Sequence, residues 1–435
     1  MSESQPLPNQ NSAEASDLAE PPKGALAIIF AIVAIDLMGF GIIIPLLPFY
    51  IKEPQQNPFK VTMLFSVFSI CQFIGSPILG AWSDKVGRKP VLALSQFGSA
   101  AGYVLLGLAT QFHFADPIIL VMVYASRIID GFTGGNISTA QAYISDVTTP
   151  KNRAKGMGLL GAAFGIGFAL GPFLGGSLGR IHLSVPAYVA ALFSLAAGVL
   201  SMTNLPESRV HKATDAEHWL HPSHFAPVLK NGVLVNLLLI SFCLMSAFVM
   251  MESTISLFLN KIFGWQQLGV GLYFGYIGLI IAVIQGGLIG RLVKKHGDWP
   301  LAIAGPMLVF AGMVGYIWLG YRGAAAGALP MLMVAGAINS AGRSFQMPTL
   351  SSLISKFSDP RQQGVVFGLS TGLSSLARVA GPVVAGLVYP YMSNTGQFVA
   401  AAIITLLMTL WLTALRQPAP GDAPPAASDA AGEQW

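Results

Sequence analysis

Residues 80–90 read Gly80-Ala-Trp-Ser-Asp84-Lys-Val-Gly87-Arg88-Lys89-Pro90. Two glycines, one acid and three basic residues in so short a stretch indicate a tight, charged turn. The turn separates two apolar runs, at 60–83 and 90–110. Runs of about 20 apolar residues have the length of helices that cross a hydrocarbon core roughly 30 Å thick. The segment therefore predicts two membrane-spanning helices joined by a cytoplasmic turn.

The composition extends this prediction to the whole chain. Of the 435 residues, 53% are hydrophobic and 10% are charged, whereas a soluble domain carries roughly 25% charged residues. A backbone that crosses lipid must satisfy its own hydrogen bonds, so spanning segments are helices or a closed barrel. Barrel strands alternate in polarity over about ten residues, and the apolar runs here do not. We therefore expect an all-α polytopic membrane protein.

The apolar runs predict twelve transmembrane helices in two halves of six. We expect helices near 24–47, 60–83, 90–110, 117–140, 154–176, 184–204, 231–258, 268–290, 300–320, 328–350, 362–387 and 394–416. The domains are then an N-terminal half at 24–204, a polar cytoplasmic linker at 205–230 and a C-terminal half at 231–416. The polar segments 1–23 and 417–435 are expected to be disordered cytoplasmic tails.

Two further patterns support this topology. With both termini in the cytoplasm, sixteen basic residues fall in inside segments and five in outside loops, which follows the positive-inside rule. Gly80 and Gly87 recur as Gly290 and Gly297, and the pair Gly171-Pro172 recurs as 381–382, both with an offset of 210. A shared offset indicates two parallel, pseudo-symmetric halves, which is an architecture of secondary transporters.

Several motifs resemble those of a known family. The turn at 80–90 resembles the signature loop of the major facilitator superfamily. The stretch Arg127-Ile-Ile-Asp130-Gly131-Phe-Thr-Gly134-Gly135 is similar to its second motif, although an uncharged residue is more usual at Asp130. Gly167-Phe-Ala-Leu-Gly171-Pro172-Phe-Leu-Gly175-Gly176 is similar to the motif of the drug/proton antiporter subfamilies.

Two other stretches narrow the resemblance to a branch. Asp36-Leu-Met-Gly39-Phe-Gly41 in the first helix fits the drug/proton antiporters, and Ala140-Gln-Ala-Tyr143-Ile-Ser-Asp146 is most similar to the tetracycline/proton antiporter branch. The resemblance covers nearly the whole chain and is weaker in the second half. There, the copy of the signature loop, 290–297, lacks the acidic residue.

The resemblance implies a major facilitator fold and a secondary transporter that works by alternating access. It implies a proton-coupled exporter of lipophilic or cationic small molecules, with the proton gradient as energy source and no cofactor or metal. We expect a functional monomer among membrane lipids, without nucleic acid, in a bacterial inner membrane. A symporter, uniporter or lipid transporter of the same fold remains an alternative, and a membrane receptor is a more distant one. The chain has no HExxH, GxSxG or P-loop pattern in place, so an enzyme is not expected.

Charged groups within a bilayer are costly and are therefore candidates for function. The acids in predicted helices are Asp36, Asp130 and Glu252. A dry site disfavours the charged form of a carboxylic acid, so such a group can exchange a proton for a cationic substrate. In the family, helices 1, 4, 7 and 10 line the central cavity. The resemblance therefore implies a proton and substrate site of Asp36, Arg127, Asp130, Asn136, Glu252, Asn339, Arg343 and Gln346.

Each of these assignments has a structural alternative. Asp36 is expected to be the principal proton or substrate carboxylate, but it is alternatively an acid that bonds a neighbouring helix. Arg127 and Asp130 are three residues apart and share a helix face, so they either form a structural pair or pass the proton. Glu252 lies either in the cavity or in a vestibule in contact with water.

Two sets of residues are expected to control the opening of the cavity. We expect a cytoplasmic gate formed by Gly80, Asp84, Gly87, Arg88, Asp146 and Arg361, unless these are solvated loop charges. The glycines Gly167, Gly171, Gly175 and Gly176 allow close helix approach, and Pro172 permits a kink. The resemblance implies that they form the interface at which the two halves seal and reopen.

Overall fold

Long helices make up the part of the chain that the computed structural model describes, namely 24–52, 54–112, 114–148, 150–208, 228, 230–358, 363–392 and 395–415. The first half contains α2 (Ala25–Ile43) with the 3-10 helix η1 (Ile44–Tyr50), α3 (Pro58–Val86), α4 (Arg88–Gln111), α5 (Asp116–Thr133) with η2 (Gly134–Asn136) and α6 (Ile137–Asp146), α7 (Pro150–Gly179) and α8 (Ser184–Asn204). The second half contains α10 (Gly232–Phe263), α11 (Gln267–Val283) with the π-helix η4 (Ile284–Leu288) and α12 (Ile289–His296), α13 (Asp298–Arg322), α14 (Ala328–Lys356), α15 (Gln363–Val388) and α16 (Gly396–Ala414).

These elements form twelve consecutive helical spans, as the sequence predicts. Eleven of the spans are long and apolar enough to cross a membrane on length and composition alone. The remaining one, α14, has 29 residues but also contains Asn339, Arg343 and Gln346, so its apolar run is interrupted. The chain is thus an integral, multi-pass membrane protein.

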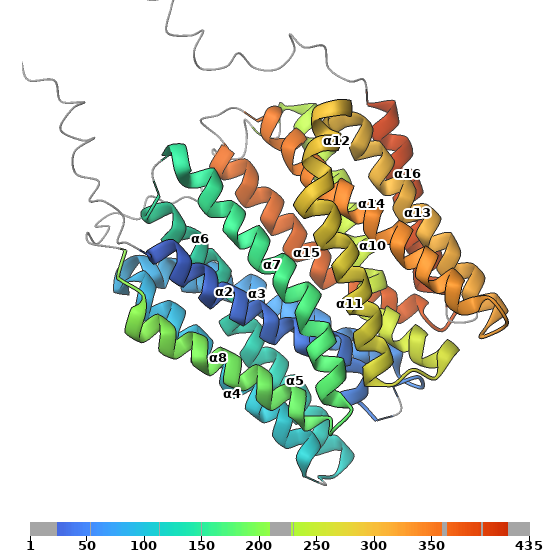
Figure 1. Cartoon of the computed structure of the whole chain (residues 1–435), viewed down its shortest axis with the longest axis horizontal. Helices are drawn as coiled ribbons and strands as arrows, with labels where there is room; N and C mark the ends of the chain where they lie inside the picture. The colour runs from blue at the N-terminus through green and yellow to red at the C-terminus, as the bar shows by residue number, and fades with distance from the viewer. Residues whose placement is uncertain are drawn as a thin grey trace, which may run out of the picture.

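The two halves are copies displaced along the sequence. Figure 1 shows the blue-to-green helices of the first half on one side and the yellow-to-red helices of the second half on the other. Adding 210 to the bounds of α4 (88–111) gives 298–321, and the structure has α13 at 298–322. The same shift carries α3 (58–86) to 268–296, where α11, η4 and α12 span 267–296. The offset seen in a few landmarks therefore holds for whole helices.

The turn after the second helix of each half depends on a glycine. Gly87 has φ +113° and its counterpart Gly297 has φ +82°. Positive φ is strained for residues with a Cβ and is readily adopted by glycine. Each glycine thereby ends one spanning helix and starts the next within a single residue, which holds the two helices antiparallel.

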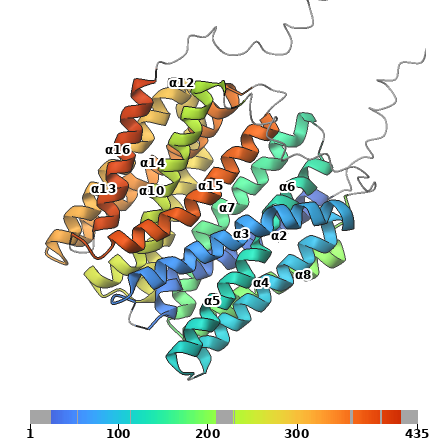
Figure 2. The ribbon, with the colours of Figure 1, turned by 180° about the vertical axis from the view of Figure 1, so that it is seen from behind.

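The two halves meet mainly along two helix pairs. Helix α7 packs on α11 and α3 packs on α15, and Figure 2 shows α3 running beside α15. The contacts concentrate near one end of the bundle, named here the loop end. There, Ser66 Oγ donates to the Val379 carbonyl oxygen at 2.9 Å, and Gln55 Nε2 donates to the Leu257 carbonyl oxygen at 2.8 Å.

The opposite end of the bundle, where the described chain begins at Gly24 and stops at Leu415, is named here the terminal end. Towards it, a Cβ on Gly161 of α7, Gly286 of η4 or Gly368 of α15 would meet no described atom within 4 Å. The helices that pair across the halves near the loop end are therefore apart near the terminal end. The two halves thus contact each other at the loop end and diverge towards the terminal end, as α7 and α11 do in Figure 1.

The expected domain boundaries stay a prediction. Of the linker at 205–230, only 205–208, 228 and 230 are among the described residues, and the segments 1–23 and 417–435 fall outside them.

Candidate functional site

The first half holds a buried ion pair in the middle of its bundle. Arg127 Nη1 lies 3.1 Å from Asp130 Oδ2, and the two side chains are 2% and 3% exposed. Both lie on α5, three residues apart, so they share one helix face. The Arg127 guanidinium also lies over the rings of Tyr103 and Phe68, at 5.6 and 6.0 Å from their centroids. Its charge is therefore balanced by one carboxylate and two aromatic faces.

Asp36 lies near this pair on α2. It is half-buried, and Asn136 Nδ2 lies 3.5 Å from its Oδ2. The Gln96 side chain of α4 and the Asp130 carboxylate are also close enough to influence the Asp36 carboxylate electrostatically. Within the described residues no basic group forms an ion pair with Asp36. The first half thus carries two intramembrane carboxylates and one arginine.

Three polar residues of α4 complete this group and were not predicted. Ser99 and Tyr103 line the same cavity as Asp36 and Asp130, and Gln96 is close enough to Asp36 to influence its carboxylate. Their spacing of three and then four residues places them on one helix face. Polar residues at that spacing in an otherwise apolar helix are the sequence signal that identifies them.

A narrow cavity connects these groups with the second half. It is lined by Asp36, Leu37, Phe40, Phe68, Gln72, Ser99, Tyr103, Asp130, Gly134, Ile137, Phe164 and Arg378. Its volume is about 20 Å³, which is room for roughly one water molecule. Arg378 comes from α15, so the cavity is shared between the halves.

The second half contributes charged groups of its own. Glu252 on α10 is half-buried and interacts electrostatically with Arg378 and Arg343. Arg343 on α14 is 8% exposed. Two other predicted residues of α14 contact α13. Asn339 Nδ2 donates to the Val309 carbonyl oxygen at 3.4 Å, and a Cβ on Gly305 of α13 would lie 2.8 Å from Gln346 N. Asn339 and Gln346 therefore pack at the contact between α13 and α14.

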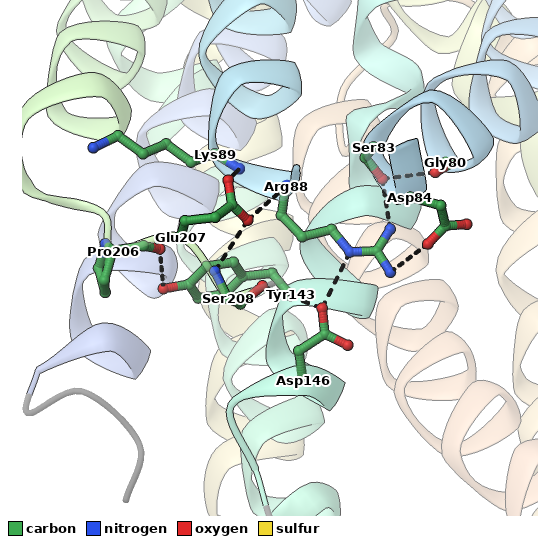
Figure 3. Close-up of polar contacts among 10 residues, drawn as sticks. All are labelled: Gly80, Ser83, Asp84, Arg88, Lys89, Tyr143, Asp146, Pro206, Glu207 and Ser208. Carbon is green, nitrogen blue, oxygen red and sulfur yellow. Dashed lines mark hydrogen bonds and ion pairs between the residues drawn. The ribbon is translucent and has the colours of Figure 1, made fainter. Parts of the chain in front are cut away.

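The residues expected at the cytoplasmic gate come together at the terminal end (Figure 3). Arg88 forms ion pairs with Asp84 at 2.8 Å and with Asp146 at 3.1 Å, and it donates to Ser83 Oγ at 2.5 Å. Ser83 in turn donates to the Gly80 carbonyl oxygen at 2.7 Å. The cluster lies wholly within the first half. Arg361, which was expected to join it, lies outside the described residues.

Glu207 is a member of this cluster that sequence reasoning missed. Its carboxylate accepts from the backbone N–H groups of Arg88 at 2.8 Å and Lys89 at 3.1 Å (Figure 3). These are first-turn groups of α4, where a helix favours an anion. A Cβ on Gly87 would lie 2.5 Å from Glu207 Oε2. Gly87 is therefore required for both its φ angle and the approach of this carboxylate.

The second half has an equivalent pair with its charges exchanged. Lys356 Nζ lies 2.6 Å from Asp298 Oδ2, and these positions are 210 residues beyond Asp146 and Arg88. The acid that the second loop lacks before Gly297 is thus supplied by the residue after it. One pair in each half ties the start of its third helix to the end of its fourth span.

The glycines of α7 serve two different contacts. A Cβ on Gly167 would lie 2.8 Å from the Leu37 backbone, and a Cβ on Gly171 would lie 2.7 Å from Gly41 Cα. Together with Gly175, which meets Ile42, they allow α7 to pack on α2 inside the first half. Gly176 is different, because its Cβ would lie 2.6 Å from Gly271 Cα of α11. The Pro172 carbonyl oxygen also lies against Gly271.

A family model described as Major Facilitator Superfamily matches residues 29–329 and 319–435. The tetracycline resistance protein, class C, of Escherichia coli is 30% identical over 405 residues, which cover 90% of this chain and 96% of that protein. Major facilitator superfamily domain-containing protein 10 of Homo sapiens is 29% identical over 450 residues, which cover 92% and 94%.

Solved structures agree with these matches. The crystal structure of the human organic anion transporter MFSD10 has a TM-score of 0.66 and 27% identity, and the match covers 90% of this chain and 100% of that chain. The nucleoside transporter NupG has a TM-score of 0.72 at 14% identity, with 90% and 99% covered. The latter likeness concerns the fold alone.

Proposed function

Because the chain belongs to the Major Facilitator Superfamily, whose members are transporters and not enzymes, we propose that it is a proton-coupled antiporter that exports a lipophilic small molecule. Tetracycline resistance proteins are among its relatives, which supports export of such a compound.

The observation that carries the proposal is the imbalance of charge in the first half. Asp36 and Asp130 line one cavity, and Arg127 is engaged by Asp130 at 3.1 Å. Asp36 has the Asn136 amide beside it and forms no ion pair with a described residue, although Arg378 lines the same cavity. A carboxylate without a cationic partner is costly inside a membrane, so Asp36 is the group best suited to take up a proton and release it when the cavity opens to water. Arg127 and Asp130 then act as a positioning pair beside it.

Alternating access supplies the coupling. In the proposed orientation the terminal end faces the cytoplasm, so the conformation described above receives substrate from inside the cell. Closing the terminal end and separating the contacts of Ser66 and Gln55 at the loop end would expose the site to the outside. A proton entering there through a potential of 100 mV supplies roughly 2.3 kcal/mol, which can drive export against a gradient.

The remaining predicted residues take supporting roles in this scheme. The cluster around Arg88 holds the terminal ends of α3, α4 and α6 together as one unit, so the first half can move as a rigid body. Gly176 and Pro172 form the segment of α7 that must separate from α11. We further propose a functional monomer, because one chain carries both halves, and a bacterial inner membrane, in keeping with the bacterial source of the tetracycline resistance relatives.

The test measures drug movement and proton movement together. Purified protein is reconstituted in liposomes that contain a pH-sensitive dye, and a pH gradient is imposed in the presence of tetracycline. We expect gradient-driven tetracycline flux with matching proton flux in the parent. Asp36→Asn should bind tetracycline but lose the coupling. Asp116→Asn, which alters an exposed aspartate paired with Lys52 at the loop end, is the matched control and should behave as the parent.

Each alternative has a distinct outcome. If tetracycline flux in the parent does not depend on the pH gradient, the protein is a uniporter and not an antiporter. Gradient-driven flux that persists in Asp36→Asn would remove Asp36 from the coupling and leave transport in place.

A further inference from the structure

The eighth span of the chain ends in a short basic segment at the surface of the bundle. The span consists of α11, η4 and α12 and runs over 267–296. No residue of η4 or α12, all of which the structure describes, is buried. Figure 1 shows α12 at the terminal end of the bundle. The last turns of this span therefore face the surroundings of the protein and not its interior.

This segment carries three cationic side chains on one side. Arg291, Lys294 and Lys295 follow the spacing i, i+3, i+4, which places them on one face of a helix. All three are exposed, and they are named here the α12 basic face. Within the part of the chain that the structure describes, no ion pair joins any of them to an acid. The face thus presents three positive charges outwards.

The corresponding turn of the first half neutralises its charges within the protein. There, Arg88 is buried and pairs with Asp84 at 2.8 Å. The position 210 residues beyond Asp84 is Lys294, so the second half has a cation where the first has an acid. The acid of the second turn, Asp298, is 6% exposed and is bound by Lys356 at 2.6 Å. The α12 basic face is therefore left without a counter-charge from its own turn.

The length of the span places this face at the surface of the membrane. The stretch from Gln267 to His296 has 30 residues, which at 1.5 Å per residue reach about 45 Å. The hydrocarbon core is about 30 Å thick, and the bilayer with its headgroups is about 40–45 Å thick. Because α11 begins at the loop end, the α12 basic face lies at the level of the lipid headgroups at the terminal end.

The same span exposes apolar side chains along the membrane core. It packs on α7 through Gly271 and Gly278, whose added Cβ atoms would each lie 2.6 Å from a Cα of that helix. By contrast, Leu279 and Val283 are 62% and 64% exposed. They are four residues apart and so share a helix face. An acyl chain can lie along these side chains while its headgroup reaches the end of the span.

We propose that the α12 basic face binds the phosphate headgroup of an anionic phospholipid, whose acyl chains lie along Leu279 and Val283. Basic residues next to a membrane attract anionic headgroups, and the fork of a guanidinium suits two phosphate oxygens. The positive-inside rule accounts for basic residues on this side. It does not account for one turn being neutralised by the protein and the other being left charged. The inference concerns a lipid site and holds whichever compound is transported.

The test compares two phospholipids that differ in headgroup and share the same acyl chains. Binding of phosphatidylglycerol and of phosphatidylcholine to the purified full chain is measured by native mass spectrometry. Each basic residue near an anionic surface contributes about fivefold, so the parent should bind phosphatidylglycerol at least about 25-fold more tightly. Single changes Arg291→Gln, Lys294→Gln and Lys295→Gln should each weaken this binding by about fivefold. The triple variant should lose the tightest phosphatidylglycerol and bind phosphatidylcholine as the parent does.

Two sets of control variants separate the site from the total charge. Changing Arg180, Lys261 and Arg322 together to glutamine removes the same charge from exposed positions at the loop end, and this variant should bind both lipids as the parent does. Changing Lys294 and Lys295 to arginine keeps the charge of the face and should keep the preference for phosphatidylglycerol. Thermal melts report folding, and the single variants decide if the triple variant does not fold.

The inference is overturned if the parent binds the two lipids equally, because the face is then only solvated charge. It is also overturned if the triple variant of α12 and the triple variant of the loop end lose phosphatidylglycerol to the same extent. Displacement of phosphatidylglycerol by an equal concentration of soluble glycerol phosphate would show a site for free phosphate and would reject the lipid as its occupant.

Discussion

Replacing Gly176 by alanine should shift the balance between the two open states of the transporter. Gly176 of α7 faces Gly271 of α11 across the two halves. An added Cβ would lie 2.6 Å from Gly271 Cα and 2.7 Å from the Gln267 carbonyl oxygen. These neighbours are backbone atoms that no rotamer change can move, so the helices must separate by about an ångström. This strain exists only while the loop end is closed.

The magnitude follows from the cost of overpacking. An extra methyl group in a tight contact costs about 1–3 kcal/mol. Because the strain is relieved when the loop end opens, the equilibrium should move towards that state by about 5- to 150-fold. By contrast, alanine at Gly175 strains the contact with Ile42 inside the first half and should lower stability in both states.

Distance measurements between spin labels can check this shift. Labels at Arg180→Cys and Lys261→Cys report on the two halves at the loop end, in a background where the free Cys71 and Cys243 are replaced by serine. Gly176→Ala should enlarge the population with the longer distance. The control is Gly161→Ala in the same helix, where a Cβ meets no described atom within 4 Å. If both variants gave the same distance distribution, the contact of α7 with α11 would not be the contact that parts.

Three other predictions concern the two ends of the bundle. Gly87→Ala should lower the free energy of unfolding by about 1–3 kcal/mol, because φ is +113° there and such strain has that cost, whereas Gly290→Ala faces open space and should be neutral in the same thermal melts. Glu207→Gln should lower stability by about 0.3–1 kcal/mol at low ionic strength, since it removes an anion from the start of α4, and a loss that persists in 1 M salt would contradict this origin. Gln55→Ala should weaken closure of the loop end by about 0.5–1.5 kcal/mol, because Gln55 Nε2 donates across the halves to Leu257 O at 2.8 Å; unchanged label distances would refute it.

Most of the fold was predictable because a helix that crosses lipid must be long and apolar, and such runs are visible in the sequence. Each span needs about 20 apolar residues, and the offset of 210 seen at Gly80, Gly87 and Gly171 extends to complete helices in the structure. The sequence set the helix ends too early at several places, as with α3, which continues to Val86. Charged residues such as Asp84 and Lys85 suggest an end there, but a helix can project beyond the hydrocarbon core while its backbone bonds continue.

The candidate site was less predictable, because the role of a polar side chain depends on which residues of other helices it contacts. Asp36 and Asp130 are recognisable in the sequence as charges within apolar runs. Gln96 and Tyr103 are not, because uncharged polar residues are common in such helices. In the sequence, Glu207 is one of several charged residues in the polar linker at 205–230. Its position at the start of α4 depends on how the chain after α8 folds back against α4. No local sequence pattern predicts this contact.

The repeat also explains why the site escapes prediction from symmetry. Turns and glycine contacts recur with the offset of 210, and even the pair of Arg88 with Asp146 recurs as Asp298 with Lys356, with its charges exchanged. The intramembrane charges do not recur. Positions 210 beyond Asp36 and Asp130 are both serine, and those 210 before Arg343 and Arg378 are threonine and phenylalanine. The turns, glycine contacts and ion pairs are kept in both halves because each half needs them to hold its helices together. The first half instead has an excess of acid and the second an excess of arginine, so the charged groups that face the shared cavity differ between the halves and symmetry cannot predict one set from the other.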